Sequence, residues 1–288
     1  MDNSNQKDTK KEHYVPIAYL ANFGINGNNG RDTIAFIYSK DTKRVIESNF
    51  ETIACENKFY WIPELDNNKN ILEIFFSQLE IDYSNHFNNL YNRIIINPKL
   101  RKSNSVQMSC AEKDFFSSFL AIQTVRTRAH RNFYKSVYDN MMTIIPDRNN
   151  PNYTKKDFQR VHTNSLLELD MANFYANLIS DRKWVFLINH TTIPFFTSDN
   201  PFIFINHDRR IHFSVVEHRV TGFFPITPRI AIQFFDKSIP RVDNSYFDIF
   251  DSKYIVFYNL WIRDYSTRFV ISNKNVFEDC FLEGFDNE

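Results

Sequence analysis

Glycine is scarce in this chain, with only 5 in 288 residues. Phosphate-binding loops of the Gly-x-Gly-x-x-Gly and Walker types need glycines at fixed positions, because only a residue without a side chain lets the backbone approach a phosphate so closely. Gly24-Ile25-Asn26-Gly27 with Gly30 fits neither spacing. The sequence therefore excludes both of these nucleotide-binding motifs.

Cysteine and long apolar runs are also lacking. Cys55, Cys110 and Cys280 are the only cysteines and none forms a Cys-x-x-Cys pair, which excludes a disulfide framework and a paired-cysteine zinc site. The longest apolar runs have about five residues, against about 18–20 for a membrane-spanning helix. The polar N-terminus has no signal-peptide pattern, so we expect a cytoplasmic protein without a membrane partner.

Net charge is absent as well, because 34 Lys and Arg balance 34 Asp and Glu. This removes the global electrostatic argument for a nucleic-acid or membrane partner, although a local basic patch would still serve. Aromatic residues are abundant instead, with 30 Phe and 14 Tyr. Aromatic side chains bury large areas, so we expect a core built largely from them.

Periodic patterns divide the chain into strand, helix and strand regions. We expect a disordered tail over residues 1–10 and a single α+β domain over residues 11–285. The predicted strands are residues 33–38 and 43–48, which form a hairpin, and 58–61, 184–188, 193–196, 202–205, 211–215, 221–224, 229–235 and 268–272. The predicted helices are residues 72–94, 111–143, 155–180 and 246–264. This order predicts an α+β fold with an N-terminal hairpin, central long helices packed on one face of a mostly antiparallel sheet, and C-terminal strands.

The helix predicted over residues 111–143 places polar side chains on its apolar face. At about 100° per residue, Gln123, Arg126 and His130 share a face with the phenylalanines of the stripe. A buried guanidinium is costly unless it is paired and hydrogen-bonded. Two interpretations fit Arg126: a buried ion pair that joins helix to sheet, or one wall of a polar cleft that binds an anion.

The opposite face of the same helix carries Arg128, Arg131 and Lys135. We expect this face to be solvated. The alternative is a stripe that contacts nucleic-acid phosphates.

Glu80 lies at the edge of the apolar stripe of the helix predicted over residues 72–94, beside Phe76 and Phe87. One interpretation is an edge glutamate whose carboxylate reaches water. The other is a carboxylate aimed at the cleft, as the partner of Arg126, a metal ligand or a general base.

The string Thr197-Ser198-Asp199-Asn200-Pro201 joins two predicted strands. Asp and Asn side chains bind nearby backbone and proline fixes φ, so a tight turn explains the string. Alternatively, the turn presents Asp199 and Asn200 at a sheet edge, where a carboxylate and an amide bind a metal or a substrate hydroxyl.

The eight histidines are scattered and form no His-x-x-x-His or His-Glu-x-x-His pattern. His13 stands out because it opens His13-Tyr14-Val15-Pro16, ahead of Tyr19, Leu20 and Phe23. No Gly-x-Ser-x-Gly elbow is present, so a serine-hydrolase triad has no support.

These strings together resemble the domain-of-unknown-function family numbered 4238. The similar segments, in order, are the His13-Tyr14-Val15-Pro16 opening, Leu79-Glu80, Gln123-Thr124-Val125-Arg126, the Trp184 strand leading into Thr197–Pro201, Phe224–Arg229 and a final helix with Asn259. The resemblance spans about residues 11–272. Ile226-Thr227 stand where the family is expected to have Leu-Ser. The resemblance implies a bacterial or phage-borne soluble protein and supplies no reaction.

The polar candidates come from three separate segments, and we expect them to converge. The first hypothesis is a phosphoryl-acting hydrolase, either a metal-dependent nuclease or a nucleotide hydrolase. Glu80 and Asp199 would hold a divalent Mg²⁺ or Mn²⁺, Arg126 the phosphate, and Asn200 the metal or a substrate hydroxyl, while His13 or Gln123 would orient water or substrate. Such an enzyme would suit a toxin or phage-defence role by analogy.

Two alternatives need no catalysis. In one, the polar network is structural and the protein is a binding module for a partner protein. In the other, the protein binds nucleic acid through the basic helix face.

Overall fold

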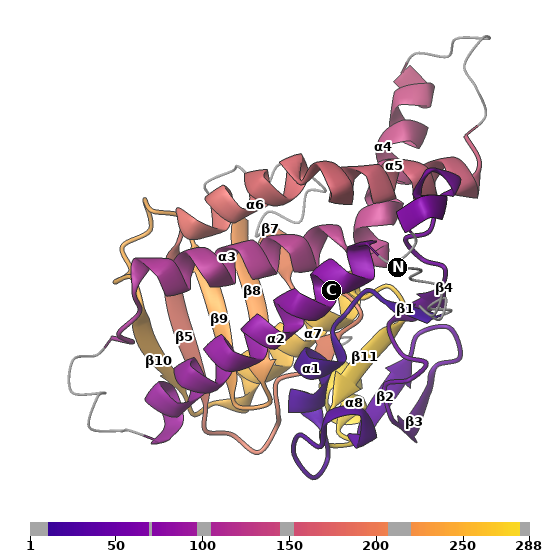
Figure 1. Ribbon diagram of the computed structural model, residues 1–288. Coiled ribbons are helices and arrows are strands. Elements are labelled where there is room, and N and C mark those ends of the chain that lie inside the picture. Colours follow the sequence, from indigo (N-terminus) through magenta and orange to yellow (C-terminus); the bar gives the residue numbers. More distant parts are fainter. Residues whose placement is uncertain (1–10, 69–70, 97–104, 145–152, 207–219, 283–288) are drawn as a thin grey trace, which may run out of the picture.

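The computed structural model describes residues 11–68, 71–96, 105–144, 153–206 and 220–282 (Figure 1). Within them the α-helices are α1 (Ile17–Leu20), α2 (Ile71–Tyr91), α3 (Cys110–Val125), α4 (Arg128–Ile144), α5 (Lys155–Glu168), α6 (Asp170–Ser180), α7 (Ser252–Tyr265) and α8 (Phe277–Leu282). The strands are β1 (Lys11–His13), β2 (Ala35–Ser39), β3 (Arg44–Ser48), β4 (Cys55–Asn57), β5 (Lys183–Asn189), β6 (Thr197–Ser198), β7 (Ile203–Asn206), β8 (Val220–Thr227), β9 (Ile230–Phe235), β10 (Ser245–Ile249) and β11 (Phe269–Ser272). The predicted tail 1–10 and strand 211–215 lie outside the described residues.

The largest sheet has five strands in the order β10-β5-β9-β8-β7, and only the β10–β5 pair is parallel. Strands β5, β8 and β9 are buried along nearly their whole length, which explains their continuous apolar runs. Strands β8 and β9 form a hairpin whose two-residue connection is Pro228-Arg229. The hairpin therefore presents Arg229 at its tip.

Two smaller sheets complete the fold. One has four strands in the order β3-β2-β11-β6, and the other pairs β1 with β4 antiparallel. The predicted N-terminal hairpin is confirmed as β2 and β3, and the predicted closing strand is β11, which pairs antiparallel with β2. This pairing places a strand from the N-terminal part of the chain beside one from the C-terminal part.

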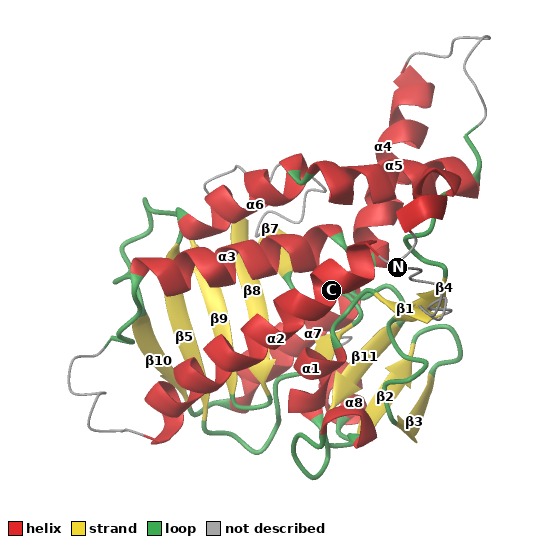
Figure 2. Cartoon of the chain, in the orientation of Figure 1, coloured by secondary structure: helices red, strands yellow, loops and turns green. Residues whose placement is uncertain are grey.

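Helices lie on both faces of the five-stranded sheet (Figure 2). Trp184, Phe186 and Ile188 of β5 point into the core shared with α2, α3 and α6. Val185 and Leu187 point to the opposite face, into the core shared with α7 and the four-stranded sheet. Successive strand residues alternate between faces, so one buried strand serves both cores. The predicted α+β class is confirmed, and α7 adds a layer behind the sheet.

Three predicted helices are wrong in extent. The helix expected over 111–143 is α3 and α4, which are separated at Arg126-Thr127. The helix expected over 155–180 breaks at Leu169, whose φ is 58°. The segment expected to be helical over 246–264 begins as β10 before α7. None of these breaks contains glycine or proline, so the residues that most strongly mark the end of a helix are absent from them.

The break at Thr127 is stabilised locally. The Thr127 hydroxyl donates to the Thr124 carbonyl at 2.9 Å and accepts from the His130 amide at 3.3 Å. Threonine at a helix start commonly binds the amide three residues on, so Thr127 acts as the N-cap of α4.

Two strand predictions also need correction. Residues 58–61 are not a strand: β4 ends at Asn57, and Lys58 has a φ of 51° that turns the chain away. Residues 193–196 precede the strand β6 instead of forming one. Each segment is a loop that contains two adjacent buried aromatic residues. Such a loop has the composition of a strand without its backbone pairing.

Arg131 corrects the prediction of a solvated basic face on α4. Its side chain is buried, with the guanidinium carbon 3.6 Å from the centre of the Phe59 ring. Nη2 donates to the Phe59 carbonyl at 2.5 Å and to Nδ1 of His162 at 3.2 Å. The Phe59 loop and His162 of α5 pack against this side of α4, so the expected solvated face does not extend over Arg131. The continuous stripe of three surface cations does not form.

His162 is held neutral by two opposed contacts. Nε2 donates to the Val125 carbonyl at 2.7 Å, and Nδ1 accepts from Arg131. Burial and then the charge of Arg131 lower the pKa of His162. Burial also lowers the pKa of the neighbouring His130, to about 4.

We expect the protein to lose stability as the pH falls below about 6.5. When the pKa of a histidine is lower in the folded than in the unfolded state, the stability that it contributes is fully present at pH values above the unfolded-state pKa. This stability is lost as the pH falls toward the folded-state pKa. His130 alone, with a pKa of about 4 against 6.5, should remove about 2 kcal/mol between pH 7 and 5. Urea unfolding at the two pH values measures this loss.

His162→Gln should flatten this pH dependence, because an amide keeps a donor and an acceptor but does not titrate. His190→Asn, at a half-exposed histidine, is the matched control. If wild type and His162→Gln lose the same stability between pH 7 and 5, protonation of His162 does not contribute to the acid sensitivity.

Within the residues that the structure describes, no helix is both long and apolar enough to cross a membrane.

Candidate functional site

Three of the six predicted site residues line one pocket of about 380 Å³. His13 comes from β1, Glu80 from α2, and Arg126 from the end of α3. Glu73 and the exposed Arg31 line the same pocket. We call this the Glu80 pocket, defined by His13, Arg31, Glu73, Glu80 and Arg126.

Helix α2 supplies two carboxylates to the Glu80 pocket. Glu73 and Glu80 are seven residues apart, which is about two turns, so they lie on one face of the helix. Phe76 lies between them and is buried. The helix packs on the sheet through this apolar stripe and holds both carboxylates at its edge.

Arg126 is the most heavily bonded residue of the pocket. Nη1 donates to Oε1 of Glu80 at 3.3 Å, Nη2 to the His13 carbonyl at 2.6 Å, and Nε to the Tyr60 hydroxyl at 3.5 Å. Its guanidinium carbon lies 4.0 Å from the centre of the Phe76 ring. The side chain is only 2% exposed. Every guanidinium nitrogen therefore has a partner, and Arg126 ties β1 and α2 to the end of α3.

His13 and Glu73 have shifted acid–base properties. Burial lowers the pKa of His13, against the raising effects of the Phe50 carbonyl and of Glu80. His13 Nε2 donates to that carbonyl at 3.0 Å, which leaves Nδ1 as the lone-pair nitrogen. Burial raises the pKa of Glu73, and the charge of Glu80 adds to this, while Arg126 opposes it. The pocket thus combines a neutral imidazole with a carboxyl group that is more readily protonated than usual.

Gln123 is buried, as predicted from the wheel, but it is not among the described residues that line the Glu80 pocket. Its Nε2 donates to the Tyr14 carbonyl at 3.1 Å. This bond fixes the backbone next to His13. Gln123 therefore supports the pocket from behind.

Asp199 and Asn200 bind the end of α7 and the segment between α7 and β11. The Asp199 carboxylate accepts from the amides of Thr267 at 2.9 Å and Arg268 at 2.8 Å, and from the Thr267 hydroxyl. Asn200 Nδ2 donates to the Tyr265 carbonyl at 3.0 Å. Both side chains thus fix the connection between α7 and β11, and neither is among the described residues lining the Glu80 pocket.

The structure therefore does not bring Glu80 and Asp199 into one pocket. In the described part of the chain, no three His, Cys, Asp or Glu residues are placed to hold a metal ion. Divalent-metal binding by this pair stays a prediction without geometric support.

Sequence reasoning missed Glu73 and Arg31 as site residues. The seven-residue spacing to Glu80 was the available signal for Glu73, whereas nothing local marks Arg31. A second pocket, lined by Arg229 and Lys274, was also missed. Its signal was weak: two of the five glycines, Gly24 and Gly27, lie in its wall.

Comparison with known proteins gives one result. A family model matches residues 11–275, most of the chain. Neither the curated proteins nor the solved structures contain a significant match. The matched range includes both pockets and the Asp199 turn. The chain therefore belongs to the family described as "Protein of unknown function (DUF4238)".

Proposed function

We propose that the Glu80 pocket hydrolyses a phosphate ester by general acid–base catalysis. The observation that carries this proposal is that His13 and Glu73, with pKa values shifted in opposite directions, line one pocket. A pair of titratable groups with displaced pKa values is typical of an acid and a base in one active site.

In the proposed reaction, His13 Nδ1 takes a proton from water as the water oxygen bonds to phosphorus. The phosphorus–oxygen ester bond breaks, and Glu73 gives its proton to the leaving alcohol oxygen. The products are an alcohol and a phosphate. Exchange with solvent then removes the proton from His13 and returns one to Glu73.

The charges of the pocket are compatible with an anionic substrate. Arg126 is paired with Glu80 at 3.3 Å and balances its charge. A protonated Glu73 adds no charge, and the exposed Arg31 supplies a cation that can contact phosphate. In this proposal Arg126 is a positioning residue, because its nitrogens hold Glu80 and His13.

The experiment is hydrolysis of p-nitrophenyl phosphate and bis(p-nitrophenyl) phosphate by the full chain. Glu73→Gln and His13→Asn should each lower kcat by about 100-fold or more. Glu47→Gln, at an exposed glutamate on β3, should leave kcat unchanged. The pH optimum of kcat should be acidic. The pKa of His13 is lowered from 6.5 and that of Glu73 is raised from 4.5, so the optimum should lie between these two values.

Assays with EDTA and with added Mn²⁺ test the metal prediction. Activity that persists in EDTA supports acid–base catalysis without a metal, and a strict Mn²⁺ requirement would favour the metal-dependent hydrolase. No turnover of either substrate by wild type would sink the phosphate-ester proposal.

The non-enzymatic binding module is the second candidate. The saturated contacts of Arg126 favour it, because a residue bonded at every nitrogen is typical of a structural network. This function predicts that Glu73→Gln and His13→Asn change no turnover.

A further inference from the structure

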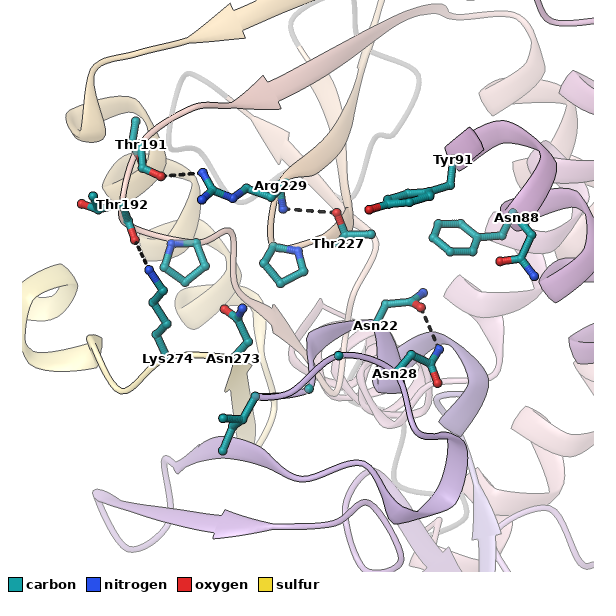
Figure 3. A pocket seen from close by; sticks show the side chains of 16 residues that line it. Asn22, Asn28, Asn88, Tyr91, Thr191, Thr192, Thr227, Arg229, Asn273 and Lys274 are labelled. Carbon is teal, nitrogen blue, oxygen red and sulfur yellow. Dashed lines mark hydrogen bonds between the residues drawn. The ribbon is translucent and has the colours of Figure 1, made fainter. Parts of the chain in front are cut away.

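The second pocket lies at the other end of α2 and shares no lining residue with the Glu80 pocket. It has a volume of about 450 Å³. Its walls are the loop from Asn22 to Asn28, the last turns of α2, the β8–β9 hairpin tip and the loops around Thr191 and Asn273 (Figure 3). We call it the Arg229 pocket, defined by Asn22, Asn88, Tyr91, Arg229, Asn273 and Lys274.

The charged residues that the structure describes in the Arg229 pocket are both cationic. Arg229 and Lys274 are the only charged residues among the sixteen described residues that line it. Arg229 Nη1 donates to the carbonyls of Asn189 at 3.1 Å and Thr191 at 2.7 Å, and Lys274 Nζ donates to the Thr192 carbonyl at 3.0 Å. Carbonyls orient these cations but do not neutralise them. In the described part of the chain neither cation pairs with a carboxylate, so the pocket has two positive charges in a protein of zero net charge.

The wall opposite the cations offers amides and an aromatic ring. Figure 3 shows Arg229, Lys274 and Asn273 on one side of the pocket and Asn22, Asn88 and Tyr91 on the other. Asn22 Oδ1 accepts from Asn28 Nδ2 at 3.0 Å. Among the described residues, Asn22 Nδ2 and Asn273 Oδ1 have no hydrogen-bond partner. The pocket walls thus contain an unsatisfied donor and an unsatisfied acceptor.

The loop beside these amides depends on two glycines. A Cβ atom at Gly24 would lie 2.3 Å from Thr33 Cγ2 and 2.4 Å from the Gly27 carbonyl oxygen. Gly27 has a φ of 85°, which other residues adopt at a cost. In a chain with only 5 glycines, two of them build this wall.

We propose that the Arg229 pocket binds a nucleoside monophosphate group. The phosphate lies between Arg229 and Lys274, whose donors suit an anionic oxygen. The base stacks on Tyr91, and the amides of Asn22 and Asn88 bind its polar edge, because an amide offers the donor and acceptor pair that bases present. The volume lies within the range of small-ligand pockets. This site is independent of the proposed hydrolysis in the Glu80 pocket.

Isothermal titration of the full chain with AMP, adenosine and inorganic phosphate tests the proposal. We expect AMP to bind, and adenosine and phosphate each to bind at least about tenfold more weakly, because each fills half of the site. Arg229→Gln/Lys274→Gln should weaken AMP binding by about tenfold or more. If the Arg229 change disturbs the β8–β9 hairpin, Lys274→Gln alone still tests the site, because Lys274 is exposed. This single variant should also weaken AMP binding. Asn88→Ala should weaken AMP but not phosphate.

The matched control is Lys135→Gln/Lys253→Gln, which removes the same charge from two exposed lysines outside the pocket. Absence of AMP binding, or an equal loss of AMP binding in this control, overturns the proposal. A 5′-phosphorylated tetranucleotide distinguishes two sources of the same group. Tighter binding than AMP assigns the pocket to a strand end, and equal or weaker binding assigns it to the free nucleotide.

Discussion

Replacing Arg126 with alanine is expected to lower the free energy of unfolding by about 3–5 kcal/mol. The truncation removes the partner of Glu80, leaves the His13 carbonyl and the Tyr60 hydroxyl without their donor, and opens a cavity against Phe76. A buried group that loses its hydrogen-bond partner retains the full cost of desolvation. Urea unfolding at pH 7 measures the loss.

Arg128→Ala is the control for this change. Arg128 lies two residues further on, is 36% exposed, and makes an ion pair with Glu56 at 3.2 Å. Exposed pairs of this kind contribute about 0–1 kcal/mol. Arg126→Lys should be intermediate, because an ammonium cannot reach three partners in one plane. If Arg126→Ala and Arg128→Ala have equal stabilities, the ion pair does not hold α3 to β1 and α2.

Asp199→Ala should have a comparable effect, also about 3–5 kcal/mol, for a different reason. The substitution leaves the amides of Thr267 and Arg268 and the Thr267 hydroxyl without an acceptor. These groups directly precede β11, the strand that pairs with both β2 and β6. Losing this anchor should weaken the pairing of β11 with β2 and β6.

Asp41→Ala provides the matched comparison. Asp41 is also an aspartate that binds Arg268, but through the side chain at 2.8 Å and with 54% exposure. Its removal should cost less than about 1 kcal/mol. A mild Asp199→Ala effect, together with loss of phosphate-ester hydrolysis, would restore Asp199 as a catalytic candidate.

These two substitutions also determine how activity data should be interpreted. Both residues were candidates for catalysis, yet their described contacts are mainly to other parts of the protein. A loss of activity in either variant would therefore follow from a disturbed fold. His13 and Glu73 test the chemistry more directly, because Glu73 is half-buried at the pocket edge and the hydrogen bond of His13 to the Phe50 carbonyl uses only one ring nitrogen.

The predictions on Arg126 illustrate how far a periodic pattern reaches. The wheel placed Gln123, Arg126 and His130 on a buried face, and all three are buried. It could not give the partners of Arg126, which lie 46 residues away at Glu80 and 113 away at His13. It failed for Arg131, because Phe59 and His162, from segments distant in the sequence, pack on that side of α4.

The sequence by itself determined the α+β class, the N-terminal hairpin, the closing strand, the family and the burial of polar groups on α3. These properties follow from local propensity and from which face of an element is apolar. The tertiary structure alone decided that Asp199 binds residues 267–268 and not Glu80, that Glu73 joins His13 at one pocket, and that Arg229 and Lys274 share another. The reason is that a hydrogen bond or ion pair depends on which distant segment packs opposite, and the period of one segment contains no information about its partner.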